Sequence, residues 1–335
     1  MEWEYGSPEE FKTSGHGLFI VCEGNFQYGN ATLSYYDSTT DSCFNEVFYR
    51  ANGMRLGDVG QSMTINDGLG WIAVNHSHVV FAIDINTFQE RGRITGFTSP
   101  RYIHFVSPEK AYVTQLWDNR IAIINPKRYE IIGYIDVPLM NSANGSTEQM
   151  VQVEQYVYVN CWSYQDRILK IDTETDLVVD ELTVGPQPNS IVVDKYNRLW
   201  TICDGGFKGS PLGEKTPALY CINLATFEVD AKFDFYPGDS PSELAINRDA
   251  DAIYWINDDV WRMDVGATRL PLRPLIRSRQ TIYYGLTVDP LTDDVYIADA
   301  IDYQQPGVIY HYSSEGKLVN SFSVGVTPGA FCWKY

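Results

Sequence analysis

The stretch VVFAIDINTFQERGRI, at residues 79–94, consists of a short apolar strand, an aspartate, a threonine-containing turn and a second strand. The same phrase returns about every 40 to 50 residues, which is the spacing of propeller blades. Close copies lie at 120–135, 167–182 and 218–233, and weaker ones at 32–47, 260–270 and 308–322. The chain thus carries seven units, and this repeat predicts the architecture before any catalytic motif is considered.

The residues around the phrase complete a four-stranded unit. Runs such as GWIAVN (70–75), RLWTIC (198–203) and AIYWIN (252–257) precede it and read as buried strands. Before these runs comes a further short strand opened by Gly-x-x-Pro or a relative, as in GFTSPRYIHFV (96–106). Four short strands joined by tight turns form the meander of one blade. No long segment has a 3.6-residue apolar period, so we expect an all-β, seven-bladed β-propeller with almost no helix.

The two ends of the chain predict how the ring closes. The last residues, VGVTPGAFCWKY (324–335), match VGPQPNSIVVDKY (184–196) and therefore form the first strand of a unit, while GHGLFIVCEGN (15–25) resembles a second strand that lacks its first. The C-terminal strand should pair with the N-terminal strands, which removes exposed sheet edges. We predict a single propeller domain at 15–335, preceded by a polar tether at 1–14.

Composition excludes some partners. The formal net charge is −18 and the isoelectric point is near 4.6, so a nucleic acid or an anionic membrane surface is a poor partner. No apolar stretch is long enough to cross a bilayer, and no signal peptide is visible at Met1.

The six cysteines form no CxxC pair, and most are expected to be buried free thiols. Cys22 and Cys332 should lie on neighbouring strands of the closing blade.

Aromatic residues fall into two groups. Those inside second strands, such as Trp71, Trp200 and Trp255, are expected to pack between blades. Others lie in the turns that leave the second strand, which emerge with the inter-blade links on one face of the disc. Clustered rings and amides on a concave face suit a flat ligand with polar edges. The residues predicted to contact this ligand are Phe26, Tyr28, Arg101, Tyr102, Trp117, Gln149, Trp162, Tyr164, Asn189, Asp204, Glu243, Tyr283, Tyr284 and Tyr303.

Catalytic motifs are absent from the sequence: it has no GxSxG, HExxH, Walker or Rossmann signature. Glu148, Asn189, Asp204 and Glu243 could nevertheless meet near the central channel. Sugar lactonases of propeller fold place Glu, Asn and Asp around one calcium ion, which requires oxygen ligands. A calcium-dependent lactonase therefore remains an alternative to a binding protein. A surface adhesion or protein-interaction propeller without a small ligand is a second alternative.

Longer phrases carry a resemblance to a known family. These phrases are LGDVGQSMTIN (56–66), GWIAVNHSHVVFAID (70–84), GFTSPRYIHFVSPEKAYVTQLWD (96–118), GSTEQMVQVEQYVYVNCWSYQDRILKIDTETD (145–176), DGGFKGSPLGEKTPALYCIN (204–223), YYGLTVDP (283–290), VYIADAIDYQQPGVIYHYS (295–313) and VGVTPGAFCWK (324–334). They resemble, over nearly the whole chain, the surface-layer-type, YncE-like propeller lipoproteins of gut Bacteroidetes, and most of all the branch known as BtuG.

The resemblance implies a function. Members of that branch capture vitamin B12 (cobalamin) outside the outer membrane and hand it to a TonB-dependent transporter of BtuB type. It implies a cell-surface protein held by a lipid anchor at its mature N-terminus, although this chain has no lipobox cysteine. On this interpretation the protein is not an enzyme, binds cobalamin or another corrinoid on one propeller face, and requires no cofactor, with a structural calcium ion left open.

Overall fold

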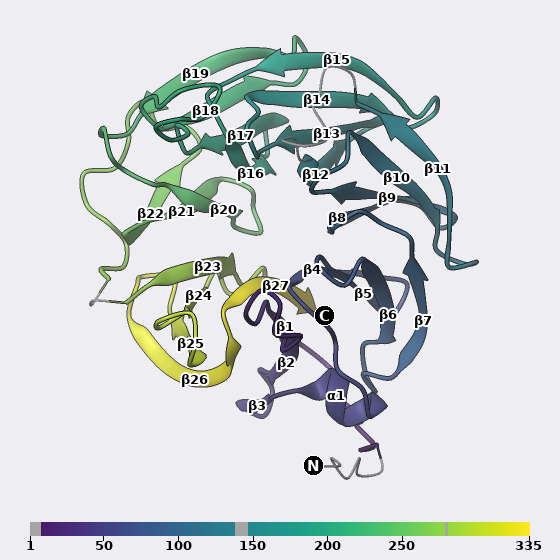
Figure 1. The fold of residues 1–335 in the computed structure, drawn as a ribbon. Coiled ribbons are helices and arrows are strands. Elements are labelled where there is room, and N and C mark those ends of the chain that lie inside the picture. The colour runs from purple at the N-terminus through teal and green to yellow at the C-terminus, as the bar shows by residue number, and fades with distance from the viewer. Residues whose placement is uncertain (1–7, 138–146, 279–280) are drawn as a thin grey trace.

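The structure, a computed structural model, describes residues 8–137, 147–278 and 281–335. The described residues form seven antiparallel sheets arranged in a ring around a central axis (Figure 1). The prediction of a seven-bladed β-propeller is confirmed. In each blade the first strand lies innermost and the last lies at the rim of the disc.

The strands of each blade follow one another from the axis outward. Blade 1 contains β27 (Pro328–Lys334), β1 (Gly17–Cys22), β2 (Thr32–Asp37) and β3 (Ser42–Phe44); blade 2 contains β4 (Gly60–Asn66), β5 (Leu69–Val74), β6 (Val79–Asp84) and β7 (Glu90–Thr95); blade 3 contains β8 (Pro100–Ser107), β9 (Lys110–Gln115), β10 (Arg120–Asn125) and β11 (Glu130–Asp136). Blade 4 contains β12 (Thr147–Val153), β13 (Tyr156–Cys161), β14 (Arg167–Asp172) and β15 (Leu177–Thr183); blade 5 contains β16 (Pro188–Val193), β17 (Arg198–Cys203), β18 (Ala218–Asn223) and β19 (Glu228–Asp234). Blade 6 contains β20 (Ser242–Ile246), β21 (Ala252–Asn257) and β22 (Asp259–Asp264), and blade 7 contains β23 (Tyr283–Val288), β24 (Val295–Asp299), β25 (Pro306–Tyr312) and β26 (Leu318–Val326).

The repeated phrase is explained by the hairpin between the third and fourth strands. In blade 2 the Asp84 carboxylate accepts hydrogen bonds from the backbone N–H groups of Asn86 (2.9 Å) and Thr87 (3.0 Å), and Phe88 follows with a positive φ of 59°. Side-chain capping of this kind is why Asp and Asn favour turns. The same pattern, with a positive φ four residues after the capping residue, begins at Asp37, Asn125, Asp172 and Asn223.

The core lies between neighbouring blades rather than at the centre of the ring. Trp71, Trp200 and Trp255 on the second strands are each about 1% exposed and pack against side chains of adjacent sheets. Their predicted structural role is confirmed. The described cysteines are all free thiols, including Cys22 and Cys332 on adjacent strands β1 and β27.

The predicted closure of the ring is also confirmed. Strand β27 pairs antiparallel with β1 from Gly17 opposite Lys334 to Cys22 opposite Pro328, and the two ends of the chain meet in one blade (Figure 1). The indole of Trp333 donates to the Thr287 hydroxyl in blade 7 at 3.0 Å. The last strand therefore joins blade 1 to blade 7.

Two elements depart from the expected four-strand pattern. Blade 6 has three strands within the described residues, and only a single bridge between Val260 and Ile276 lies where a fourth would pair. Pro271 and Pro274 lie in this segment, and proline cannot donate to a β-ladder.

Within the described residues, one short helix, α1 (Val47–Asn52), covers the outside of blade 1, and no helix is long and apolar enough to cross a membrane.

The described part of the predicted tether lies against the propeller. The Phe11 ring packs 5.0 Å from that of Phe88, the Thr13 N–H donates to the Asn86 carbonyl at 3.0 Å, and Glu9 forms an ion pair with Arg50. Residues 8–14 therefore dock on blades 1 and 2, because Phe11 supplies an apolar anchor that the polar composition of the segment concealed. Residues 1–7 lie outside the described residues.

Candidate functional site

The innermost strand of every blade carries a β-bulge close to its start. In blade 2, Gly60 pairs with Val74 and Ser62 with Ala73, so the ladder skips Gln61. A bulge turns a side chain away from its place in the sheet. The ladders skip, blade by blade from 1 to 7, Gly329, Gln61, Arg101 with Tyr102, Glu148 with Gln149, Asn189, Glu243 with Leu244, and Tyr284.

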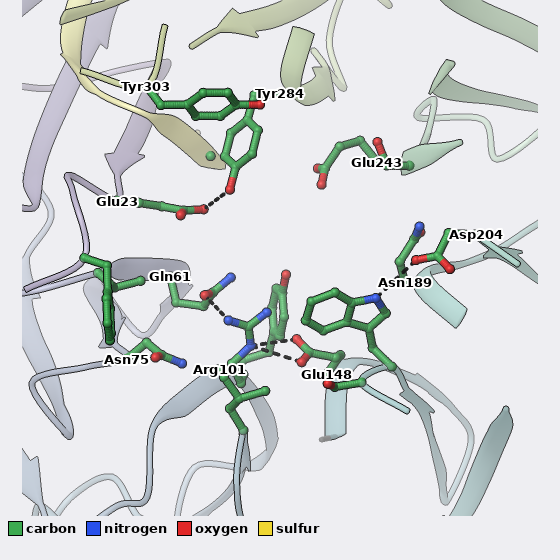
Figure 2. A pocket seen from close by; sticks show the side chains of 18 of the residues that line it. Glu23, Gln61, Asn75, Arg101, Glu148, Asn189, Asp204, Glu243, Tyr284 and Tyr303 are labelled. Atoms are coloured by element: carbon green, nitrogen blue, oxygen red, sulfur yellow. Dashed lines mark hydrogen bonds and ion pairs between the residues drawn. The ribbon is translucent and has the colours of Figure 1, made fainter. Parts of the chain in front are cut away.

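These bulges form the floor of a large bowl at the mouth of the central channel. The bowl has a volume of about 1260 Å³, and each of the seven bulges contributes at least one residue to its lining. Its walls come from the loops between second and third strands and from the links between blades, as the repeat predicted. Figure 2 shows side chains from several blades pointing into this space.

The bowl gathers most of the residues that the sequence singled out. Lining it are Phe26, Arg101, Tyr102, Trp117, Trp162, Asn189, Asp204, Glu243, Tyr283, Tyr284 and Tyr303. The other predicted residues lie outside its lining: Tyr28 is 74% exposed, the Gln149 side-chain carbonyl accepts the Ile191 N–H at 3.0 Å, and the Tyr164 ring meets that of Phe207 edge-on at 5.9 Å.

One half of the floor is a buried network around Arg101. Its Nε donates to both carboxylate oxygens of Glu148, at 2.8 and 3.1 Å, and its Nη1 donates to the Gln61 side-chain carbonyl (Figure 2). Only 14% of the Arg101 side chain and 3% of the Glu148 side chain are exposed. Burial disfavours the charged guanidinium, but Glu148 outweighs it and the pKa of Arg101 is raised. The pair is therefore a fixed ionic contact in a low-dielectric setting.

The opposite half of the floor is acidic. The Tyr284 hydroxyl donates to Glu23 at 3.0 Å, and burial raises the pKa of Glu23 despite this bond. Glu243 lies across the channel, and burial together with the nearby Glu23 carboxylate raises the pKa of Glu243 to about 8. Figure 2 shows Glu23, Tyr284 and Glu243 facing the same space.

Sequence reasoning missed Glu23 because it follows β1 in an ordinary turn. A signal existed in Gly329, the glycine at the bulge of blade 1, where the other blades carry a side chain. A Cβ at position 329 would lie 2.6 Å from Glu23 Oε1. Glycine at the bulge thus leaves room for a side chain from the neighbouring strand.

Between the two halves lies a patch built on Trp162. Its indole N–H is 3.4 Å from Asp204 Oδ2, and its ring lies 5.9 Å from the guanidinium carbon of Arg101. Burial raises the pKa of Asp204, although hydrogen bonds from the Gly206 N–H and Trp162 oppose this. The Asn189 amide donates to the Pro241 carbonyl at 2.9 Å, linking blades 5 and 6.

The rim of the bowl is aromatic and partly open to solvent. Phe26, Trp117 and Tyr303 are 60%, 44% and 42% exposed. The Phe26 ring lies 4.5 Å from that of His76, and the Tyr303 ring meets Tyr284 edge-on at 5.6 Å. Exposed rings around a polar floor provide apolar contact at the edge and hydrogen bonds at depth.

Comparison with known proteins identifies the family. Residues 16–326 match a family described as a domain of unknown function, DUF5074. The chain belongs to this DUF5074 family. No curated protein matches the sequence.

Solved structures place the DUF5074 chain among propellers. A quinonprotein alcohol dehydrogenase-like protein from Bacteroides thetaiotaomicron has a TM-score of 0.69 at 14% identity, with 94% of this chain and 77% of that chain covered. The periplasmic gluconolactonase of Pseudomonas aeruginosa has a TM-score of 0.70 at 10% identity, with 96% and 99% covered. At such low identities these likenesses show the fold alone.

Proposed function

We propose that this protein captures a corrinoid such as cobalamin in the bowl and passes it to a TonB-dependent outer-membrane transporter of BtuB type. One observation supports the proposal most directly: the same cavity has an aromatic rim and a floor of polar side chains supplied by the bulges. A corrin is broad and flat, with apolar faces and amide arms around its edge. The aromatic rings of the rim can pack against the apolar faces of the corrin, and the polar side chains of the floor can hydrogen-bond its amide arms.

The size of the bowl supports a large ligand. Its volume of about 1260 Å³ exceeds the range of about 300–1,000 Å³ typical of sites for drug-sized molecules. Burying several hundred Å² of apolar corrin surface at about 25 cal/mol/Å² would contribute on the order of 10 kcal/mol before the costs of association. A volume of this kind is more than a single sugar lactone requires.

The floor is already ordered, which favours tight binding. The contacts Arg101–Glu148, Tyr284–Glu23 and Asn189–Pro241 each join neighbouring blades, through residues of their inner strands or of the turns and links beside them. A ligand therefore meets side chains whose conformations are fixed by the blades. Preorganisation of this kind lowers the entropy lost on binding.

A metal-dependent lactonase is the second candidate, because Glu148, Asn189, Asp204 and Glu243 all line the same cavity and a gluconolactonase is among the similar structures. The donor set fits calcium poorly, since Glu148 is held by Arg101 and the Asn189 Oδ1, the atom that would ligate calcium, accepts the Ser190 hydroxyl at 2.8 Å. No group of three or more His, Cys, Asp or Glu positioned to hold a metal occurs in the described part of the chain. The side-chain engagements therefore favour the binding role.

Calorimetric titration with cyanocobalamin tests the proposal. We expect saturable binding of one corrinoid per chain, with the same affinity after dialysis against EDTA. Lactone hydrolysis that requires added calcium would favour the enzyme. Absence of cyanocobalamin binding would refute corrinoid capture.

Surface location, lipid anchoring and delivery to the transporter rest on the resemblance to BtuG-type lipoproteins. Co-purification tests the delivery step. A TonB-dependent transporter of BtuB type should co-elute with it from detergent-solubilised outer membranes. A protein recovered in the cytosolic fraction of its native cells would contradict the surface location.

A further inference from the structure

Within the described residues, Glu243 differs from the other polar side chains of the floor, because no hydrogen-bond partner lies against its carboxylate. Among the described residues its carboxylate makes no hydrogen bond or ion pair, and Figure 2 shows it pointing into the open part of the bowl. It lies in the bulge of β20, where the ladder skips from Ser242 to Ala245, and its φ of 58° is in the left-handed region. That region is uncommon for a non-glycine residue.

None of the described residues that line the bowl supplies a counter-ion to Glu243. Among the described residues that line the bowl, Arg101 is the sole Lys or Arg, and its guanidinium already binds Glu148 and Gln61. Glu23 receives one hydrogen bond, from Tyr284. The blade 1, 6 and 7 side of the bowl thus carries three carboxylates, those of Glu23, Asp258 and Glu243, and, among the described lining residues, no cation.

We propose that Glu243 is a specificity-determining residue that accepts N–H donors of the ligand and disfavours ligands carrying a carboxylate at that position. The inference rests on the proposed function, in which the ligand's edge carries primary amides. It places at least one amide arm of the corrin on the side of the bowl formed by blades 1, 6 and 7.

Either protonation state of Glu243 suits a primary amide. The ionised carboxylate accepts the amide N–H, and the protonated carboxyl, which burial favours by raising the pKa to about 8, also donates its O–H to the amide carbonyl. A ligand carboxylate has no N–H to offer the ionised form of Glu243. It can accept the O–H of the protonated form, but it then places a negative charge beside Glu23 on a side of the bowl where the described lining residues include no cation. Uncompensated charge in a partly buried site is strongly disfavoured.

The experiment compares cyanocobalamin with its monocarboxylic acid derivatives, in which one peripheral amide is hydrolysed. Their dissociation constants are measured at pH 7 by calorimetry for the parent protein, for E243Q, and for E228Q as a control. Glu228 is exposed on the outer strand β19, so E228Q removes a carboxylate without touching the bowl. E23Q provides a second variant of the acidic half should E243Q fail to fold.

For the parent and E228Q, we expect at least one derivative to bind about tenfold or more weakly than cyanocobalamin, the effect of one lost charge-assisted hydrogen bond. In E243Q, whose amide can donate to a carboxylate, this ratio should fall to within about threefold, and E23Q should lower it as well. Equal binding of all derivatives by the parent, or an unchanged ratio in both E243Q and E23Q, overturns this inference alone. Parent protein that binds neither cyanocobalamin nor any derivative overturns the proposed function and this inference with it.

Discussion

Replacing Trp162 by alanine should accelerate release of cyanocobalamin without weakening the fold. Trp162 lies between the two halves of the floor, near the Arg101 guanidinium and Asp204, and belongs to none of the described hydrophobic core clusters. An aromatic anchor at the centre of an interface typically costs about 2 kcal/mol or more when truncated, which corresponds to about 30-fold in affinity.

The effect should fall mainly on the off-rate, because mutations within one interface change association little. Surface plasmon resonance with immobilised protein measures the release rate directly. Tyr196→Ala is the matched control: Tyr196 is 61% exposed, on the turn between β16 and β17, and does not line the bowl. Asp204 keeps its Gly206 N–H in the variant, so melting temperature should change little. Release from W162A about as slow as from the parent, at equal thermal stability, would refute the placement of the ligand on this patch.

Arg101→Leu should lower the free energy of unfolding by about 3–5 kcal/mol, because the buried Glu148 loses its guanidinium, and R101L/E148L should recover much of this in urea denaturation; additive losses would contradict a coupled pair. Because the pKa of Glu243 is raised from 4.5 to about 8, the folded state binds more protons than the unfolded state in that window, so Glu243 makes stability fall as pH rises from 4.5 to about 8. E243Q should flatten that part of the stability profile, and an identical profile would argue against the shift. Deleting residues 328–335 removes β27, exposes the edge of β1 and should yield aggregated protein by size-exclusion chromatography, whereas a monomeric, folded product would show that closure is dispensable.

Much of the fold could be predicted because its determinants are local. Asp84 and its equivalents cap their own turns, and the alternation of apolar residues defines each strand, so both are visible in a window of one blade. The closing pair β27–β1 was predictable because 324–335 resembles the first strand of other units. Phe11 and the short helix α1 were not, since their stability comes from packing against distant residues such as Phe88 and Phe81.

The sequence predicts which part of the propeller forms the site, but not which side chains contact one another there. The repeat indicates which loops share a face, which is why most of the chosen residues line the bowl. It does not indicate the bulges, because a bulge depends on how two strands pair. Strand pairing brings Arg101 into an ion pair with Glu148 of the next blade. It also directs the Gln149 side chain to the Ile191 N–H, outside the lining of the bowl. Glu23 occupies the space that a side chain at Gly329 would fill.

A crystal structure of the protein grown with cyanocobalamin tests the central claim most directly. The account predicts one corrin in the bowl, with the rings of Phe26, Trp117 and Tyr303 against its faces and amide arms within hydrogen-bond distance of Glu243 and Asn189. A corrin bound on the opposite face of the disc, or crystals that contain none at saturating ligand, would contradict it.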